Sequence, residues 1–196
     1  AIIMSDLIIK PSGTSANFKV QNPSGTDKIV MNSSGTITTG TLGSGVTFPA
    51  GMVLQVVSAK FSLSVTVTST SFNTDDVLGS LQITPKVASS NILLTAFIVM
   101  NVNSSGAYMY GDFYKNASDV TETANLSGHT HGLSSIDDAA GWTQISYMFL
   151  DTCSENSLSQ KTYKTSARLH NSGTGYLGWN PNTEMAHHLL AQEIAV

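Results

Sequence analysis

The chain has 196 residues, of which 41% are hydrophobic and only 11% are charged, and its formal net charge is −4. The hydrophobic fraction is sufficient for a packed core, which excludes a disordered tail, and the nine scattered Lys and Arg residues exclude a basic stripe for nucleic acid. Ser and Thr make up about a quarter of the chain. Because hydroxyl side chains suit strands and turns better than the wet faces of helices, this composition predicts β-structure.

The first ten residues lack the basic start and the continuous apolar run of a signal peptide. No later stretch is long and apolar enough to span a bilayer. We therefore expect neither secretion by a signal peptide nor membrane insertion.

A turn phrase containing Ser-Gly-Thr recurs near the N-terminus, at residues 11–14, 23–26 and 33–36. The apolar stretches between these turns are too short to bury a core within one chain. Two interpretations stay open for residues 1–46: a floppy extended arm, or a β-structured stem in which three chains supply one another's missing strands. We expect this segment to be a stem or docking arm and residues 47–196 to form a head domain.

The remainder of the chain predicts a compact all-β domain. Residues 61–70 alternate with period two, with Phe61, Leu63, Val65 and Val67 on one face, and residues 91–101 are apolar on both faces, which is typical of a central strand buried on both sides. The expected strands are 52–60, 61–70, 81–85, 91–101, 107–115, 141–151, 161–169, 175–180 and 185–194. This number of strands without an amphipathic helix predicts an antiparallel two-sheet sandwich of the jelly-roll type.

A family resemblance runs from Gly51 to Val196. It rests on the order GMVLQVVSAK, then an alternating strand, then LGSLQITPKVASSNILLTAFI, and finally MAHHLLAQEIAV. This order resembles small structural and tail-fibre proteins of tailed bacteriophages, particularly aquatic ones, whose signature is a strand of the form S-I-T-P-K followed by an N/K-I-L-V run. The resemblance implies a β-sandwich head on a virion component, and its motifs are structural rather than catalytic.

Residues 116–140 form a connection longer than most loops, and loops of this length are usually functional or disordered. We expect a receptor-facing surface here, and the candidate residues are Asn116, Asn125, His129, His131, Asp137 and Asp138. His129 and His131 lie on one side of an extended segment if it is a strand, so three chains around a threefold axis would present six imidazoles to one metal ion. The alternative is a Ser/Gly/His loop that sits in water.

The sequence contains little evidence for an enzyme. The adjacent carboxylates Asp75-Asp76 and Asp137-Asp138 diverge in an extended chain, so neither pair has the geometry of a glycosidase site. Cys153 has no predicted base beside it and is expected to be a small buried residue. We expect no catalytic residue and no cofactor apart from the metal ion considered at His129 and His131.

Aromatic residues crowd the segment from Tyr108 to Tyr114, and exposed aromatic rings beside Asn and Ser can stack on sugars, although each ring by itself is more often part of a core. The favoured hypothesis is a non-enzymatic homotrimer on the outer surface of a phage particle. It would be a tail-fibre or spike component whose residues 1–46 dock on other virion proteins and whose sandwich faces the host surface, with a host glycan as a candidate partner. Two alternatives are a capsid decoration protein and a carbohydrate-binding adhesion module.

Overall fold

The computed structural model describes residues 18–21, 23–25, 27–31, 34, 37–40, 49–74, 77–103, 106–117, 120–123, 125–137, 141–154, 156–178 and 187–196. All regular structure in these ranges is β-strand, so the described residues include no helix that could cross a membrane. The chain divides into two compact units, 1–47 and 48–196, which are described separately.

The N-terminal unit contains a three-stranded antiparallel sheet in the order β1-β2-β3. The strands are β1 (Phe18–Gln21), β2 (Asp27–Met31) and β3 (Ile37–Gly40). The turn between β1 and β2 contains Gly25 with φ of 80°, a left-handed conformation that glycine adopts without strain. This turn reverses the chain, so β1 and β2 become antiparallel neighbours.

This pairing corrects one expectation about the stem. The short apolar stretches were expected to need neighbouring chains for their backbone pairing, but β2 pairs with β1 on one side and β3 on the other within the same chain. The expectation is wrong for these strands because the turns are short enough to form a meander. Residues 7–9, the first of the apolar stretches, lie outside the described residues.

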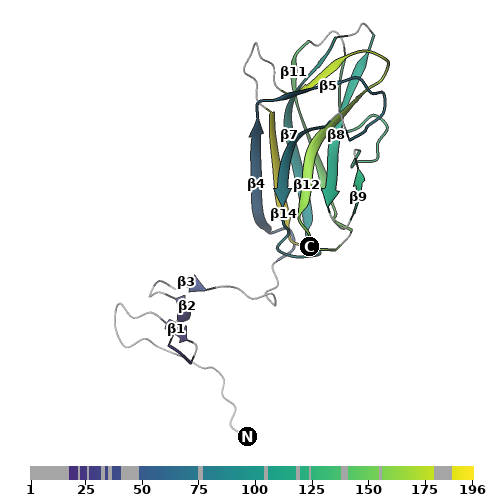
Figure 1. The fold of residues 1–196 in the computed structure, drawn as a ribbon. Coiled ribbons are helices and arrows are strands. Elements are labelled where there is room, and N and C mark those ends of the chain that lie inside the picture. The colour runs from purple at the N-terminus through teal and green to yellow at the C-terminus, as the bar shows by residue number, and fades with distance from the viewer. Residues whose placement is uncertain are drawn as a thin grey trace. The chain divides into compact units, whose positions relative to one another are not determined.

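The second unit is a sandwich of two antiparallel sheets, which Figure 1 shows as two layers of strands. The first sheet contains β4 (Val53–Phe61), β5 (Ser64–Val67), β7 (Asn91–Val102), β11 (Thr143–Asp151), β13 (Gly175–Gly178) and β14 (His187–Ile194). The second contains β6 (Val77–Ile83), β8 (Tyr108–Ala117), β9 (Val120–Thr123), β10 (Ser134–Asp137) and β12 (Lys161–Leu169).

The pairing of these strands gives the order of each sheet. In the first sheet β14 lies between β4 and β7, β11 pairs with the other edge of β7, and β13 joins β7 to β5. In the second sheet the order is β10-β8-β12-β6, and β9 also pairs with β8.

The strand order identifies the fold as a jelly roll. The chain changes sheet after β5, β6, β7, β10, β11 and β12, and its first and last sandwich strands, β4 and β14, pair side by side. Within the two sheets, the neighbouring strands β4-β14-β7-β11 and β6-β12-β8-β10, connected in this way, form the double Greek key of a jelly roll. The predicted all-β antiparallel sandwich is confirmed.

All nine expected sandwich strands are present, with shifts of a few residues at their ends. The expected long loop at 116–140 is different, because β9 and β10 form within it and extend the β8 sheet. Leu63 also departs from the expected alternation: the strand breaks between β4 and β5, so Leu63 is 65% exposed, while Val65 packs against the core.

The core lies between the two sheets and is filled by alternate side chains of each strand. On β7 the even-numbered residues from Ile92 to Val102 point inward and are fully or almost fully buried. Phe113, Tyr163 and Leu177 from other strands complete the same cluster. Cys153 is 3% exposed and packs here, as expected from the sequence.

A buried carboxylate holds the connection that follows β6. Glu193 on β14 is fully buried, and its Oε1 accepts hydrogen bonds from the backbone N–H of Lys86 at 2.7 Å and of Val87 at 3.0 Å. The Ser90 hydroxyl donates to the same oxygen at 2.7 Å, and Gln55 Nε2 donates to Oε2 at 2.7 Å. One side chain therefore fixes the connection between β6 and β7.

We predict that Glu193→Ala destabilises the sandwich by about 3 kcal/mol, because four donors lose their acceptor in a buried site. Urea unfolding followed by tryptophan fluorescence measures this, since both tryptophans belong to the second unit. Gln192→Ala, at the neighbouring outward position of β14, is the matched control and should cost less than about 1 kcal/mol. Equal losses in the two variants would contradict the anchoring role.

A second buried polar group, His187, lies at the start of β14. Its ring contacts Phe61 at a centroid distance of 5.4 Å, its Nε2 is 3.4 Å from Thr165 Oγ1, and its Nδ1 has no hydrogen-bond partner among the described residues. Burial, with a smaller contribution from the charge of His188, lowers the pKa of His187 to about 3. The folded chain therefore keeps this imidazole neutral at pH values where the unfolded chain protonates it.

Since the unfolded state binds the proton near pH 6.5 and the folded state only near pH 3, stability from His187 is lost as the pH falls through this window. We predict a loss of about 2 kcal/mol between pH 6.5 and pH 5, at roughly 1.4 kcal/mol per pH unit. His187→Leu should remove this component, whereas His188→Asn should retain it. Unfolding free energies measured at both pH values check the prediction, and an unchanged pH slope in His187→Leu would contradict it.

Candidate functional site

The outer face of the β8 sheet carries a row of alternating large side chains. Tyr108, Tyr110, Asp112 and Tyr114 point outward from β8, because Met109 and Phe113 occupy the inward positions between them. Tyr108 is 45% exposed, whereas the other three are buried. A segment of the same chain, the covering segment of residues 125–133, lies against Tyr110 and Asp112 of this row.

Asp112 holds the start of the covering segment. Its carboxylate accepts hydrogen bonds from the Ser127 hydroxyl, from the Ser127 N–H at 3.2 Å and from the Phe113 N–H at 2.6 Å. Burial raises the pKa of the Asp112 carboxyl, and the hydrogen bonds to Ser127 and Phe113 oppose this increase. Backbone bonds from Leu126 N to Phe113 O and from Leu133 N to Gly111 O fix the two ends of the segment on β8.

Arg168 on β12 holds the middle of the segment. Its Nε and Nη2 both donate to the carbonyl of Thr130, at 2.8 and 2.5 Å, and its Nη1 donates to the carbonyl of Thr70 at 2.9 Å. The guanidinium lies 4.8 Å from the centroid of the Tyr110 ring and is almost fully buried. A planar fork of donors above an aromatic ring is the arrangement that arginine, and not lysine, provides. The segment is therefore held rigidly on the sheet.

The two histidines of the Gly-His-Thr-His-Gly phrase do not form an extended pair. The segment turns between them, because Gly132 N donates to His129 O at 2.9 Å. His131 packs on the Tyr110 ring at 4.9 Å and lies 6.5 Å from His170, while the His129 carbonyl accepts from Asn125 Nδ2. Among the described residues no group of three or more His, Cys, Asp or Glu side chains could hold a metal ion within one chain. A metal shared by three chains at His129 and His131 stays a prediction.

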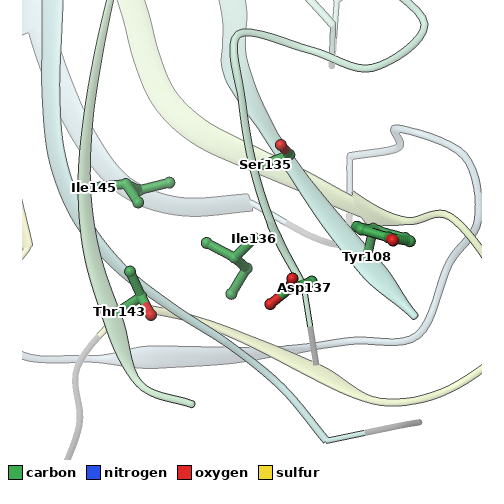
Figure 2. Close-up of a pocket in the computed structure, with 6 residues that line it drawn as sticks. All are labelled: Tyr108, Ser135, Ile136, Asp137, Thr143 and Ile145. Atoms are coloured by element: carbon green, nitrogen blue, oxygen red, sulfur yellow. The ribbon is translucent and has the colours of Figure 1, made fainter. Parts of the chain in front are cut away.

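A pocket of about 320 Å³ opens beside the exposed end of the tyrosine row. Figure 2 shows Ile136 of β10 and Ile145 of β11 pointing toward each other in this pocket. Asp137 is the register partner of Tyr108, so a carboxylate and an exposed aromatic ring lie side by side on the outer face. The remaining lining residues are Ser135 and Thr143, which contribute hydroxyl groups.

This arrangement can bind a polar ligand that has an apolar face. An exposed ring offers a stacking surface, and the neighbouring carboxylate and hydroxyls offer hydrogen-bond acceptors and donors. The His170 ring is exposed and lies edge-on to the Tyr108 ring, at a centroid distance of 6.1 Å. Rings and hydroxyls in this combination suit a saccharide.

The six residues that were predicted to form a receptor-facing surface lie in different parts of the structure. Asp137 lines the pocket, and His131 lies on the adjacent tyrosine row. Asn125 and His129 lie in the covering segment, and Asn116 is an exposed residue of β8. Asp138 lies outside the described residues. The sequence analysis named the aromatic segment from Tyr108 to Tyr114 as a candidate surface for stacking on sugars. It did not single out Arg168, although an arginine in a strand of so charge-poor a chain is a signal that could have been followed.

Comparisons with known proteins give distant structural neighbours only. No protein-family model and no curated protein matches the chain. Solved structures with a distant similarity to the chain include the VP2 subviral particle of infectious bursal disease virus, at 13% identity and a TM-score of 0.35, and the Gx strain of this virus, at 14% identity and a TM-score of 0.41. These matches cover 89% and 91% of this chain, but the chain spans only 46% of each neighbour. Such TM-scores are too low to support an assignment, so the fold is assigned from the strand order of the chain itself.

Proposed function

We propose that this chain is a non-enzymatic virion structural protein of a tailed phage, a homotrimeric tail-fibre or spike component whose sandwich head attaches to the host surface. The observation that carries the proposal is the site around Tyr108, where an exposed ring and the Asp137 carboxylate are adjacent on paired strands. The resemblance of residues 51–196 to phage structural proteins supports the virion location.

The attachment role is supported by the rigidity of the surface around the site. Tyr108 and Asp137 lie on strands, and Asp112 and Arg168 hold the covering segment beside them. A site that is already ordered loses little conformational entropy when a ligand binds. Weak binding of one saccharide per head is useful on a fibre because several heads on one particle bind together.

The site predicts that Tyr108→Ala weakens binding of the full chain to an array of bacterial surface polysaccharides by about tenfold or more, since the stacking surface is lost. Tyr108→Phe is the matched control: it keeps the ring and should retain most of the binding. Binding of Tyr108→Ala equal to that of the natural chain would remove the site from the proposal, and no binding by any form would count against a glycan receptor.

Copy number tests the location on the particle. We predict about a few tens of copies per virion when purified particles are measured by quantitative mass spectrometry against labelled peptides of the chain, because tail fibres occur in small symmetric sets. A count in the hundreds would instead favour the capsid decoration hypothesis. Absence from the particles would overturn the virion assignment altogether.

A further inference from the structure

The outer face of the other sheet differs from the Tyr108 face. Strands β4, β14, β7 and β11 lie side by side, and the inward positions of each strand fill the core. The register places Met148 beside Thr95 and Leu150 beside Leu93, and on the other side of β7 it places Leu190 beside Thr95 and Ile194 beside Asn91. We call the outward positions of these four strands the apolar sheet face, and its large apolar members are Val53, Val56, Leu93, Phe97, Met148, Leu150, Leu190 and Ile194.

Much of this face is exposed in the single chain. Met148 is 64% exposed, Val56 is 55% exposed, and Phe97, Leu150 and Val53 are each 44% exposed. An antiparallel sheet with one face in water normally alternates apolar inward and polar outward residues. On β6 and β12 of the opposite sheet this rule holds, since Gln82, Thr162 and Lys164 are outward. On β8 of that sheet Tyr110 and Tyr114 are outward but are already buried within the chain. A wide exposed apolar face is therefore found on one sheet of the sandwich.

The charges of the face favour a second copy as the occupant. Its outward positions include Lys60 and His188 and no carboxylate, although the whole chain has thirteen Asp and Glu residues. Glu193 and Asp151, the acidic residues of β14 and β11, point inward or are buried. Two identical faces without acidic groups can approach each other without like-charge repulsion over most of their area, whereas a strongly charged partner finds little to pair with.

The size of the face suits the centre of a stable interface. Four strands about 4.8 Å apart and roughly eight residues long at 3.3 Å per residue cover a footprint of roughly 500 Å². A standard interface removes about 800 Å² of accessible surface per partner, with an apolar centre that is poor in charge and a polar rim. The apolar sheet face has the area and composition of such a centre.

We infer that the apolar sheet face packs against other copies of this chain. This deepens the proposed function by naming the surface through which its subunits associate. It also accounts for the outward side chains of Leu93 and Phe97 on β7, which are covered when copies associate, whereas the inward side chains of β7 fill the core and the outward Val99 is already buried within the chain.

Sedimentation velocity of the full chain over a hundredfold range of concentration tests the inference. We expect a species of two or more chains, and we expect Met148→Glu to weaken association about a hundredfold or more, because a buried carboxylate would lack a partner. Gln82→Glu adds the same charge to the outer face of the opposite sheet and should leave association unchanged. Circular dichroism and urea unfolding confirm that each variant is folded.

Several outcomes would overturn the inference. They are a single chain at every concentration, equal effects of Met148→Glu and Gln82→Glu, or loss of association in Val20→Glu alone, which would assign the contact to the β1-β3 sheet. A second test uses the natural chain, so its result does not depend on whether the Met148→Glu variant folds. Hydrogen peroxide should oxidise Met148 more slowly as the protein concentration rises, and an oxidation rate independent of concentration would also overturn the inference.

The measured mass separates this inference from the proposed function. A trimer that Met148→Glu dissociates supports both. A dimer that Met148→Glu dissociates supports the apolar sheet face as the interface and removes the trimer from the proposed function, because one patch packed on its own copy has twofold symmetry.

Discussion

The alternation of β7 is the constraint on which the rest of the sandwich depends. This strand pairs with β11 along one edge and with β14 and β13 along the other, so its register fixes the whole sheet. Its even-numbered side chains fill the core. Because a strand has period two, Leu93 and Phe97 must then point outward. A shift of one residue would expose Ile92 and Leu94 instead, so the core and the apolar outer face are two results of one register.

Few charged residues occur in the chain, and several of them hold connections in place. Glu193 fixes the connection between β6 and β7, and Asp112 and Arg168 fix the segment that covers the tyrosine row. Asp151 accepts hydrogen bonds from Tyr163 and from the Cys153 N–H, and it pairs with Lys115 at 2.7 Å. Each group is buried with specific partners, since a buried charge without partners is strongly unfavourable. The surface consequently carries few charges, among them Lys60 and Asp137.

The sequence was sufficient for the fold class and for nine sandwich strands, because period-two alternation and flanking turn residues are local signals. It was insufficient for β9 and β10, which are four residues each and form because β8 offers them an edge. The pairing of Tyr108 with Asp137 depends on the register between strands 29 positions apart in the chain, so no local pattern could reveal the pocket. The stem was misjudged because strand length was weighed without the geometry of the turns around Gly25.

The two surfaces of the sandwich can serve different purposes because they belong to different sheets. Tyr108 and Asp137 lie on β8 and β10, whereas Phe97 and Met148 lie on β7 and β11 of the opposite layer. If copies associate through the apolar sheet face, the Tyr108 sites remain on the outside of the assembly. Association then multiplies the sites without covering them, so a site with weak affinity for one saccharide becomes effective on a surface that repeats that saccharide. Under the proposed function, the jelly roll would thus separate assembly from recognition by placing each on its own sheet.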